Sequence, residues 1–254
     1  MISLTTTREN ELKELYKELF IIRKEIENKY PKKQHSIFTC EIGEEYANSK
    51  IKFMLIGRCA NGWSRDTFDS ADSFSDEFVE KFEKANDFKW IIEEFGKQRN
   101  TDNTYNLETS RFWTYSRELF KVLTKDIKGH YIGARIWQDC IVQSDLYKIS
   151  PTLKGNPGVR AQRMQKDICL ALLKKEIEIL KPTHILFVTD ENWLFDEITG
   201  KLSKPSAKYE YIKLTGYFSN TKVIVTPHPG RNGVKKAPYV DECIKAFKEL
   251  ENQC

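Results

Sequence analysis

Apolar residues recur at helical spacing in several stretches of this chain. The clearest stretch begins at residue 6, where Thr6 and Glu9 match a capping box and apolar side chains follow at every third or fourth position. Asn156 and Pro157 have the residue types of a helix cap and a first helical turn. The pattern predicts helices over residues 6–29, 74–98, 109–126 and 156–180, a short helix from Glu191 and a terminal helix from Pro238.

Short apolar runs between these helices predict the core strands. They cover residues 51–56, 140–146, 184–189 and 222–226, and residues 209–214 form a further candidate strand. Because strands alternate with helices, we expect an α/β fold, namely a three-layer α/β/α sandwich around a central, mostly parallel four-stranded sheet. The first helix precedes this alternation, so we expect a helical extension over residues 1–48 that packs on a single compact domain of residues 49–254.

The composition is that of an ordinary soluble protein. The 254 residues suit one domain, and 40% of them are apolar while 31% are charged. No apolar run approaches the roughly 20 residues of a membrane-spanning helix. The first ten residues already carry charges, so we expect a cytoplasmic protein with no membrane partner. We also expect a monomer.

Cysteine spacing and glycine motifs exclude several kinds of site. The six cysteines are scattered, with no CxxC pair and no Cys/His cluster, so we expect neither a metal site nor a disulfide framework. The chain contains no GxGxxG, P-loop, GxSxG or HExxH motif, which removes the main support for dinucleotide, nucleotide-triphosphate, serine-hydrolase and zinc-protease chemistry. We therefore expect no cofactor.

Three of the predicted strands end in polar residues. The strand at 51–56 runs into a glycine turn, the strand at 140–146 presents Asp145, and the strand at 222–226 leads to His228. The carboxyl ends of parallel strands meet at one edge of a sheet, so we expect these side chains to line one pocket. A glycine turn, a carboxyl group and an imidazole suit a flat, polar, ring-shaped ligand.

Together these segments resemble the uracil-DNA glycosylase superfamily. GRCANGW stands where that family has a glycine-rich catalytic loop, SDLYKISP where it has an asparagine-bearing strand end followed by Lys and Pro, and HPGRNG where it has a His-Pro-Ser or similar loop. The resemblance covers residues 51–235, without the N-terminal helical segment or the long insertion between the first two motifs. It implies a uracil-DNA glycosylase-like fold and a hydrolase that flips a pyrimidine nucleotide out of DNA and cleaves its N-glycosidic bond.

The resemblance assigns stabilisation of the departing base to His228. The imidazole would donate a hydrogen bond to base O2, where negative charge develops as the bond breaks. Alternatively, His228 only bonds the backbone of its own turn.

Asp145 stands where the family has an asparagine that reads the Watson–Crick edge of uracil. An ionised carboxylate only accepts hydrogen bonds, so it suits the exocyclic N4 amine of cytosine. A protonated carboxyl would instead donate to O4, which keeps uracil as a substrate. A third alternative is that Asp145 caps the following turn or pairs with Lys148.

The first motif lacks the tyrosine that blocks bulk at base C5 in uracil-specific members. Asn61 beside Gly62 implies a roomier pocket at that edge, and together with Asp145 it points to a 5-modified cytosine. Excision of ordinary cytosine would damage the host genome, so such an enzyme suits phage defence through attack on modified phage DNA. The alternative is a uracil-excising DNA repair glycosylase.

The water-activating residue is the largest departure from the family. Cys59 stands where members have Asp, Asn or Glu, and a thiol cannot act as a base without ionising. Asn61 is the favoured residue for positioning the water, and Asp66 is the second candidate; either could equally be a turn residue. A relative that has lost its base and only binds DNA or a modified base is therefore a further alternative.

Base contacts are expected from the first motif as well as from Asp145. Gly57 and Gly62 would bring the backbone close to the base, and Trp63 would stack on it. The alternative for Trp63 is a place in the core.

DNA is the expected partner, and four residues are the candidates for contacting it. Arg58 and Lys148 would contact phosphates, while Arg231 or Asn232 would fill the hole that the flipped base leaves in the duplex. The net charge of +4 is mild, although basic residues gather near two of the strand ends. A solvated surface of mixed charge is the alternative.

Overall fold

The computed structural model describes residues 4–60, 68, 70–85, 88, 109–127, 137–153 and 155–252. These residues form a mixed α/β structure. Their contacts divide into two compact units, which we describe in turn. The first unit comprises Met1–Ile42, Gly57–Ala85 and Gln143–Lys181, and the second comprises Gly43–Ile56, Asn86–Val142 and Pro182–Cys254.

Helix α1 of the first unit, Thr6–Lys29, confirms the predicted helix over residues 6–29. Its cap is Thr5 and not Thr6, because the Thr5 side chain accepts a hydrogen bond from the Arg8 backbone N–H at 3.4 Å. The apolar face carries Leu12, Tyr16 and Leu19, which are all 0% exposed. That face explains why the 3.6-residue spacing predicted the helix correctly.

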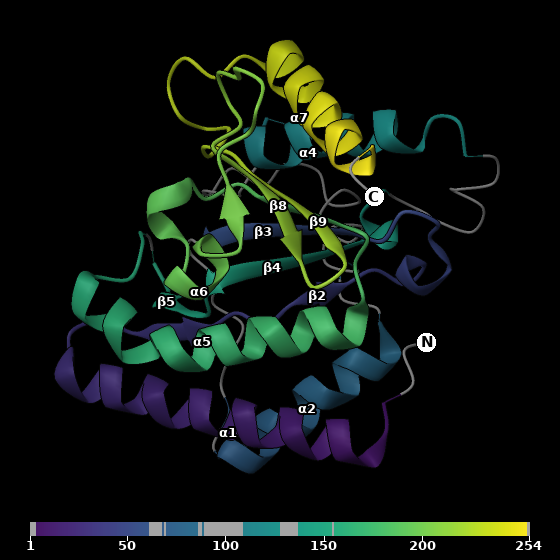
Figure 1. The fold of residues 1–254 in the computed structure, drawn as a ribbon. Coiled ribbons are helices and arrows are strands. Elements are labelled where there is room, and N and C mark those ends of the chain that lie inside the picture. The colour runs from purple at the N-terminus through teal and green to yellow at the C-terminus, as the bar shows by residue number, and fades with distance from the viewer. Residues whose placement is uncertain are drawn as a thin grey trace. The chain divides into compact units, whose positions relative to one another are not determined.

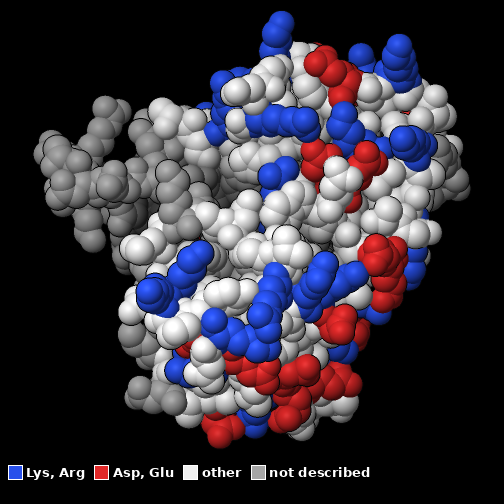
Figure 2. Space-filling model, turned by 90° about the vertical axis from the view of Figure 1, so that its left-hand side faces the viewer, with Lys and Arg blue, Asp and Glu red and all other residues white. Residues whose placement is uncertain are grey.

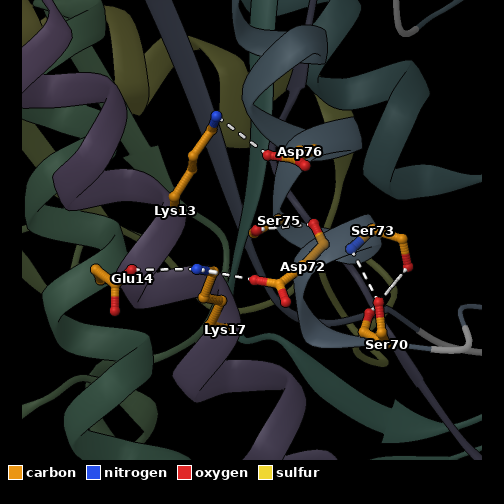
Figure 3. Close-up of polar contacts among 8 residues, drawn as sticks. All are labelled: Lys13, Glu14, Lys17, Ser70, Asp72, Ser73, Ser75 and Asp76. Carbon is orange, nitrogen blue, oxygen red and sulfur yellow. Dashed lines mark hydrogen bonds and ion pairs between the residues drawn. The ribbon is translucent and has the colours of Figure 1, made fainter.

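Helix α1 runs beside α2, Ala71–Lys84, and α5, Val159–Leu180 (Figure 1). Tyr16 packs against Phe74 and Phe78 of α2, with ring centroids 6.1 and 5.6 Å apart. Around these rings, ion pairs join the two helices: Lys13 to Asp76 at 3.1 Å and Lys17 to Asp72 at 2.9 Å (Figure 3).

Several helix boundaries differ from the prediction, and two of them have a local cause. Helix α2 ends at Lys84 because Ala85 takes a left-handed conformation with φ of 44°, so it is shorter than the predicted 74–98; residues 89–98 lie outside the described part. Helix α5 is capped by Gly158, so Asn156 and Pro157 precede the helix instead of opening it.

Seven strands of the described residues form one sheet in the order β2-β4-β3-β6-β9-β8-β7. Their bounds are β2 Glu41–Ile42, β3 Phe53–Cys59, β4 Ile141–Tyr147, β6 His184–Phe187, β7 Leu202–Ser203, β8 Leu214–Phe218 and β9 Thr221–Val225. A separate pair, β1 His35–Ile37 and β5 Ile149–Pro151, is antiparallel. The predicted four-stranded sheet was too narrow: β2 and β7 have two residues each and give no readable alternation, and β8 begins where the candidate strand at 209–214 was expected to end.

The sheet is mixed within the second unit. β6 is parallel to both β3 and β9, as predicted for the core strands. β8 and β7 are antiparallel to their neighbours. The strand predicted at 209–214 begins only at Leu214, because Glu242 of α7, Lys236–Glu251, accepts hydrogen bonds from the Glu210 and Tyr211 backbone N–H groups.

The second unit buries its own apolar core. Helices α4, Arg111–Thr124, and α7 lie next to each other (Figure 1). The short helices η1 Tyr46–Asn48, η2 Trp137–Cys140, η3 Glu191–Trp193 and α6 Asp196–Thr199 complete its elements. The core combines apolar side chains of strands and helices, among them Phe53, Leu55, Leu119, Phe120, Leu186, Ile224, Tyr239 and Phe247.

Candidate functional site

Asp145 lies near the carboxyl end of β4, a strand with almost every residue buried. Its side chain is 2% exposed, and among the described residues no hydrogen-bond partner lies within reach of Oδ2. Burial raises the pKa of the Asp145 carboxyl to about 8; the positive charge of Lys148 opposes the rise and the negative charge of Glu176 adds to it. The carboxyl is therefore mainly neutral at pH 7, and it can both donate and accept.

Lys148 lies in the interior, in a cluster that we call the buried triad: Ser144, Lys148 and Glu176. Lys148 is 0% exposed, and its Nζ donates to Ser144 Oγ at 2.5 Å and to Glu176 Oε1 at 2.7 Å. Ser144 Oγ donates to Glu176 Oε2 at 2.7 Å. This burial and pairing contradict the prediction that Lys148 contacts a DNA phosphate, and the acid that pairs with Lys148 is Glu176, not Asp145.

Helix α5 fixes the chain just after Asp145. The Gln165 amide bonds the Ile149 backbone twice: Oε1 accepts from the N–H and Nε2 donates to the carbonyl, both at 2.8 Å. Cys169 Sγ accepts from the Lys148 N–H at 3.3 Å. The end of β4 is therefore held by side chains of a helix and is not a loose turn.

The end of β3 carries Cys59, whose thiol donates to Asn156 Oδ1 at 3.2 Å. Burial raises the pKa of the Cys59 thiol to about 12; the charge of Asp145 also raises it, and Arg58 opposes the rise. Cys59 therefore stays a thiol at neutral pH and cannot act as a general base. Because β3 and β4 are neighbours in the sheet and the charge of Asp145 acts on Cys59, the ends of these two strands lie close together in the first unit.

The other residues of the first motif contribute less to this picture. Gly57 is buried within β3 and Arg58 is half-buried, so the base contact of Gly57 and the phosphate contact of Arg58 stay predictions. Asn61, Gly62, Trp63 and Asp66 lie outside the described residues, and their roles in water activation, base contact and stacking stay predictions as well.

His228 lies in the loop that follows β9 in the second unit. Its Nδ1 accepts a hydrogen bond from the Gly230 backbone N–H at 3.0 Å, so the neutral ring carries its proton on Nε2. The ring is stacked on Phe112 of α4, with centroids 6.1 Å apart and planes 20° apart. The expected backbone bond of the turn is present and makes Nε2 the protonated nitrogen of the neutral ring, and donation from Nε2 to a base stays a prediction.

Tyrosine hydroxyl groups hold this loop. Tyr115 donates to the Val234 carbonyl at 3.1 Å, and Tyr211 donates to the Gly233 carbonyl at 3.4 Å. At the start of the loop, the hydroxyl groups of Thr226 and Tyr239 lie 2.7 Å apart. These contacts tie the loop to α4, to the chain before β8 and to α7.

Arg231 is exposed and ion-paired at the tip of the loop. Its Nη1 lies 3.0 Å from Asp190 Oδ2, and its side chain is 64% exposed. Asn232 beside it is exposed. Both residues are accessible, so their DNA contacts stay predictions.

Figure 2 shows Lys and Arg side chains lying among Asp and Glu side chains on one face, which is a mixed charge pattern.

Sequence reasoning missed Glu176, Phe112 and Asp190. Glu176 had a readable signal, because it lies four residues after Leu172 on the apolar stripe of α5, and a carboxylate on such a stripe requires a buried cation. Phe112 and Asp190 had no such signal, since each matters only through a contact with a residue distant in the sequence.

Among the described residues, no group of three His, Cys, Asp or Glu side chains is placed to hold a metal ion. In the same part of the chain, no helix combines the length and the apolar character needed to cross a membrane. A scan against models of known protein families and a search of curated proteins found no match to the sequence.

Proposed function

We propose that this protein is a DNA glycosylase that hydrolyses the N-glycosidic bond of a flipped pyrimidine, with a 5-modified cytosine as the favoured base. The observation that carries the proposal is Asp145, a buried carboxyl whose Oδ2 has no partner among the described residues. A buried polar atom without a partner costs free energy, so such an atom at the end of a core strand suits a site that a ligand completes. The proposed architecture is the three-layer sandwich of the uracil-DNA glycosylase superfamily.

The proposed base contacts follow from the proton on Asp145. A neutral carboxyl offers a hydroxyl donor beside a carbonyl acceptor. It would pair with N3 and the N4 amine of cytosine, or with N3–H and O4 of uracil. Uracil therefore remains the alternative base, and the C5 preference rests on Asn61 and Gly62 of the first motif.

His228 is proposed to stabilise the departing base. Its Nε2–H would donate to base O2, on which negative charge builds as the glycosidic bond breaks. The hydrogen bond from Gly230 and the stack on Phe112 support this role because they orient the ring before any ligand arrives. Loss of one such oriented donor costs roughly 10²–10³ in rate, by analogy with oxyanion holes.

A protein that binds a modified base in DNA without cleaving it is the second candidate. The observation that favours it is the Cys59 thiol, whose pKa burial raises to about 12 where the family has a water-activating side chain. The glycosylase proposal then needs Asn61 to position the water, or Asp66 to accept its proton.

Base release from defined oligonucleotides tests the proposal. Duplexes and single strands carrying uracil, cytosine, 5-hydroxymethylcytosine or glucosylated cytosine are incubated with the protein, and abasic sites are then cleaved with alkali. We expect cleavage with at least one modified cytosine and a loss of about 10²–10³ in rate for His228→Ala. DNA binding without an abasic product from any substrate would favour the binding protein.

A further inference from the structure

The buried triad is electrically balanced. Lys148 and Glu176 are each 0% exposed, and the ammonium group donates to the carboxylate at 2.7 Å. Ser144 bridges the two: it accepts from Lys148 Nζ and donates to the second Glu176 oxygen. One positive and one negative charge thus cancel within the first unit, close to Asp145.

Burial is the main reason that the Asp145 carboxyl holds its proton, and the balance within the triad sets how far the nearby charges oppose it. Among the described residues, Lys148 Nζ donates to Ser144 and to Glu176, and neither of these bonds goes to Asp145. A buried carboxyl that has no cation of its own is more stable in the protonated form. Without the Glu176 charge, the same lysine would be an uncompensated buried cation beside Asp145 and would favour its ionised form.

Three thiols and one arginine are further titratable groups that the described residues place around this cluster. Cys59 on β3 and Cys169 on α5 are thiols whose pKa burial raises to about 12 in each case. Cys40, which precedes β2, is buried and lies near Lys148. Arg58 on β3 is a further cation of the described residues, and it acts on Cys59.

We propose that Glu176 is a positioning residue for Asp145: by pairing with Lys148 it allows the buried Asp145 carboxyl to stay neutral, and the neutral carboxyl selects a ligand edge that places a hydrogen-bond donor beside an acceptor. The Watson–Crick edge of a pyrimidine is such an edge. The part of the proposal that concerns the ligand, which we call the ligand half, therefore rests on the proposed function. The part that concerns the neutral state of Asp145, which we call the electrostatic half, rests only on the buried triad and Asp145.

Infrared titration of the protein labelled with ¹³C at aspartate carboxyl groups tests the electrostatic half. Asp145→Asn identifies the Asp145 signal. We expect the titration midpoint of Asp145 to fall by at least about one pH unit in Glu176→Gln, a tenfold change in proton affinity. The matched control is Glu178→Gln, which changes an exposed carboxylate of α5 paired with Lys175 and Arg8, and there the midpoint stays in place.

The double variant Lys148→Met with Glu176→Gln keeps the triad balanced and provides the test if Glu176→Gln does not fold. Its midpoint should stay within about half a pH unit of the wild type. A shift of more than about one unit in the double variant, or no shift in a folded Glu176→Gln, would overturn the inference.

Base release measured against pH tests the ligand half. Excision by the wild type should decline as Asp145 ionises, because the carboxylate can still accept from the N4 amine of cytosine but no longer donates to N3. The decline should move to lower pH in Glu176→Gln by the shift found in the infrared titration. A decline that stays in place while the infrared midpoint moves contradicts the ligand half. If no base is released at any pH, the proposed function fails, and the infrared result alone then decides the electrostatic half.

Discussion

Asp145 and His228 are fixed by opposite means. Asp145 is buried near the end of β4, and no described residue forms a hydrogen bond with its Oδ2. His228 is half-buried, and its ring is aligned by a backbone hydrogen bond on Nδ1 and by Phe112 on one face. Asp145 therefore has an unsatisfied oxygen with which a ligand can form a hydrogen bond, and His228 presents a hydrogen-bond donor in a fixed direction.

Asp145 should make the stability of the protein depend on pH. The pKa of the carboxyl rises from 3.8 to about 8 on folding because of burial, so the native state holds more protons than the unfolded state between these values. The unfolding free energy should therefore fall as pH rises from about 4 to about 8, by up to about 1.4 kcal/mol per pH unit. Urea unfolding at a series of pH values measures this slope.

Asp145→Asn is the matched variant for that measurement, since it keeps the shape and removes the titration. The difference in unfolding free energy between variant and wild type should grow in favour of the variant as pH rises. A constant difference across this pH range would show that Asp145 is ionised in the native state.

Gly230→Ala should disturb the His228 ring. A Cβ at Gly230 would lie 2.9 Å from His228 Nδ1 and 3.1 Å from Cε1, too close for the present ring position. We expect loss of the Gly230 hydrogen bond, which is worth about 1 kcal/mol, and a changed tautomer ratio in the ¹⁵N spectrum of His228. Gly158→Ala is the control, because its Cβ would meet nothing within 4 Å; an unchanged His228 spectrum in Gly230→Ala would contradict the expected clash.

At the scale of elements, helices α1 and α2 are joined both by apolar contacts and by ion pairs, which contribute unequally to stability. Their facing sides share Tyr16, Phe74 and Phe78, and their rims share the pairs Lys13–Asp76 and Lys17–Asp72 (Figure 3). Buried apolar surface is the larger contribution, because exposed ion pairs are screened by water and salt.

Leu19→Ala should destabilise the protein far more than Lys17→Ala. Leu19 is 0% exposed on α1, so its truncation leaves a cavity and should cost about 2–5 kcal/mol of unfolding free energy. Lys17→Ala removes only exposed pairs. Chemical denaturation of both variants checks the order, and equal losses would mean that the ion pairs matter as much as the core.

The sequence predicted elements well where the apolar period was long. Helix α1 confirmed its prediction from Thr6 to Lys29, and the core strands β3, β4, β6 and β9 lie where apolar runs indicated. The short strands escaped detection because two or three residues carry no period. Asn156 misled the prediction of the α5 start because its side chain bonds Cys59 and not the helix.

At the scale of the whole molecule, the candidate site could be predicted only in part. Sequence position alone placed Asp145 and His228 at strand ends, because alternating strands and helices imply parallel pairing. Burial could not be predicted for Lys148, since its partner Glu176 lies on a helix 28 residues further along the chain. That Asp145 and His228 contact the same flipped base stays a prediction of the proposed function.

Association with DNA should depend on salt. The net charge is +4 and the basic side chains lie among acidic ones (Figure 2), so binding would rest on a few local phosphate contacts. We expect affinity for duplex DNA to fall as salt rises, and the slope of log affinity against log salt to drop by about 1 in Arg231→Ala if this residue binds a phosphate. Fluorescence anisotropy measures both, with Lys222→Ala, whose lysine pairs with Glu251, as the control.

The Gln165 amide has a consequence beyond the site that it supports. By occupying both backbone polar groups of Ile149, it closes the outer edge of a short strand, β5, that would otherwise offer them to an extended segment of another molecule. A glutamine on a helix thus takes the place of a neighbouring strand, and both backbone polar groups of Ile149 are already bonded within the protein.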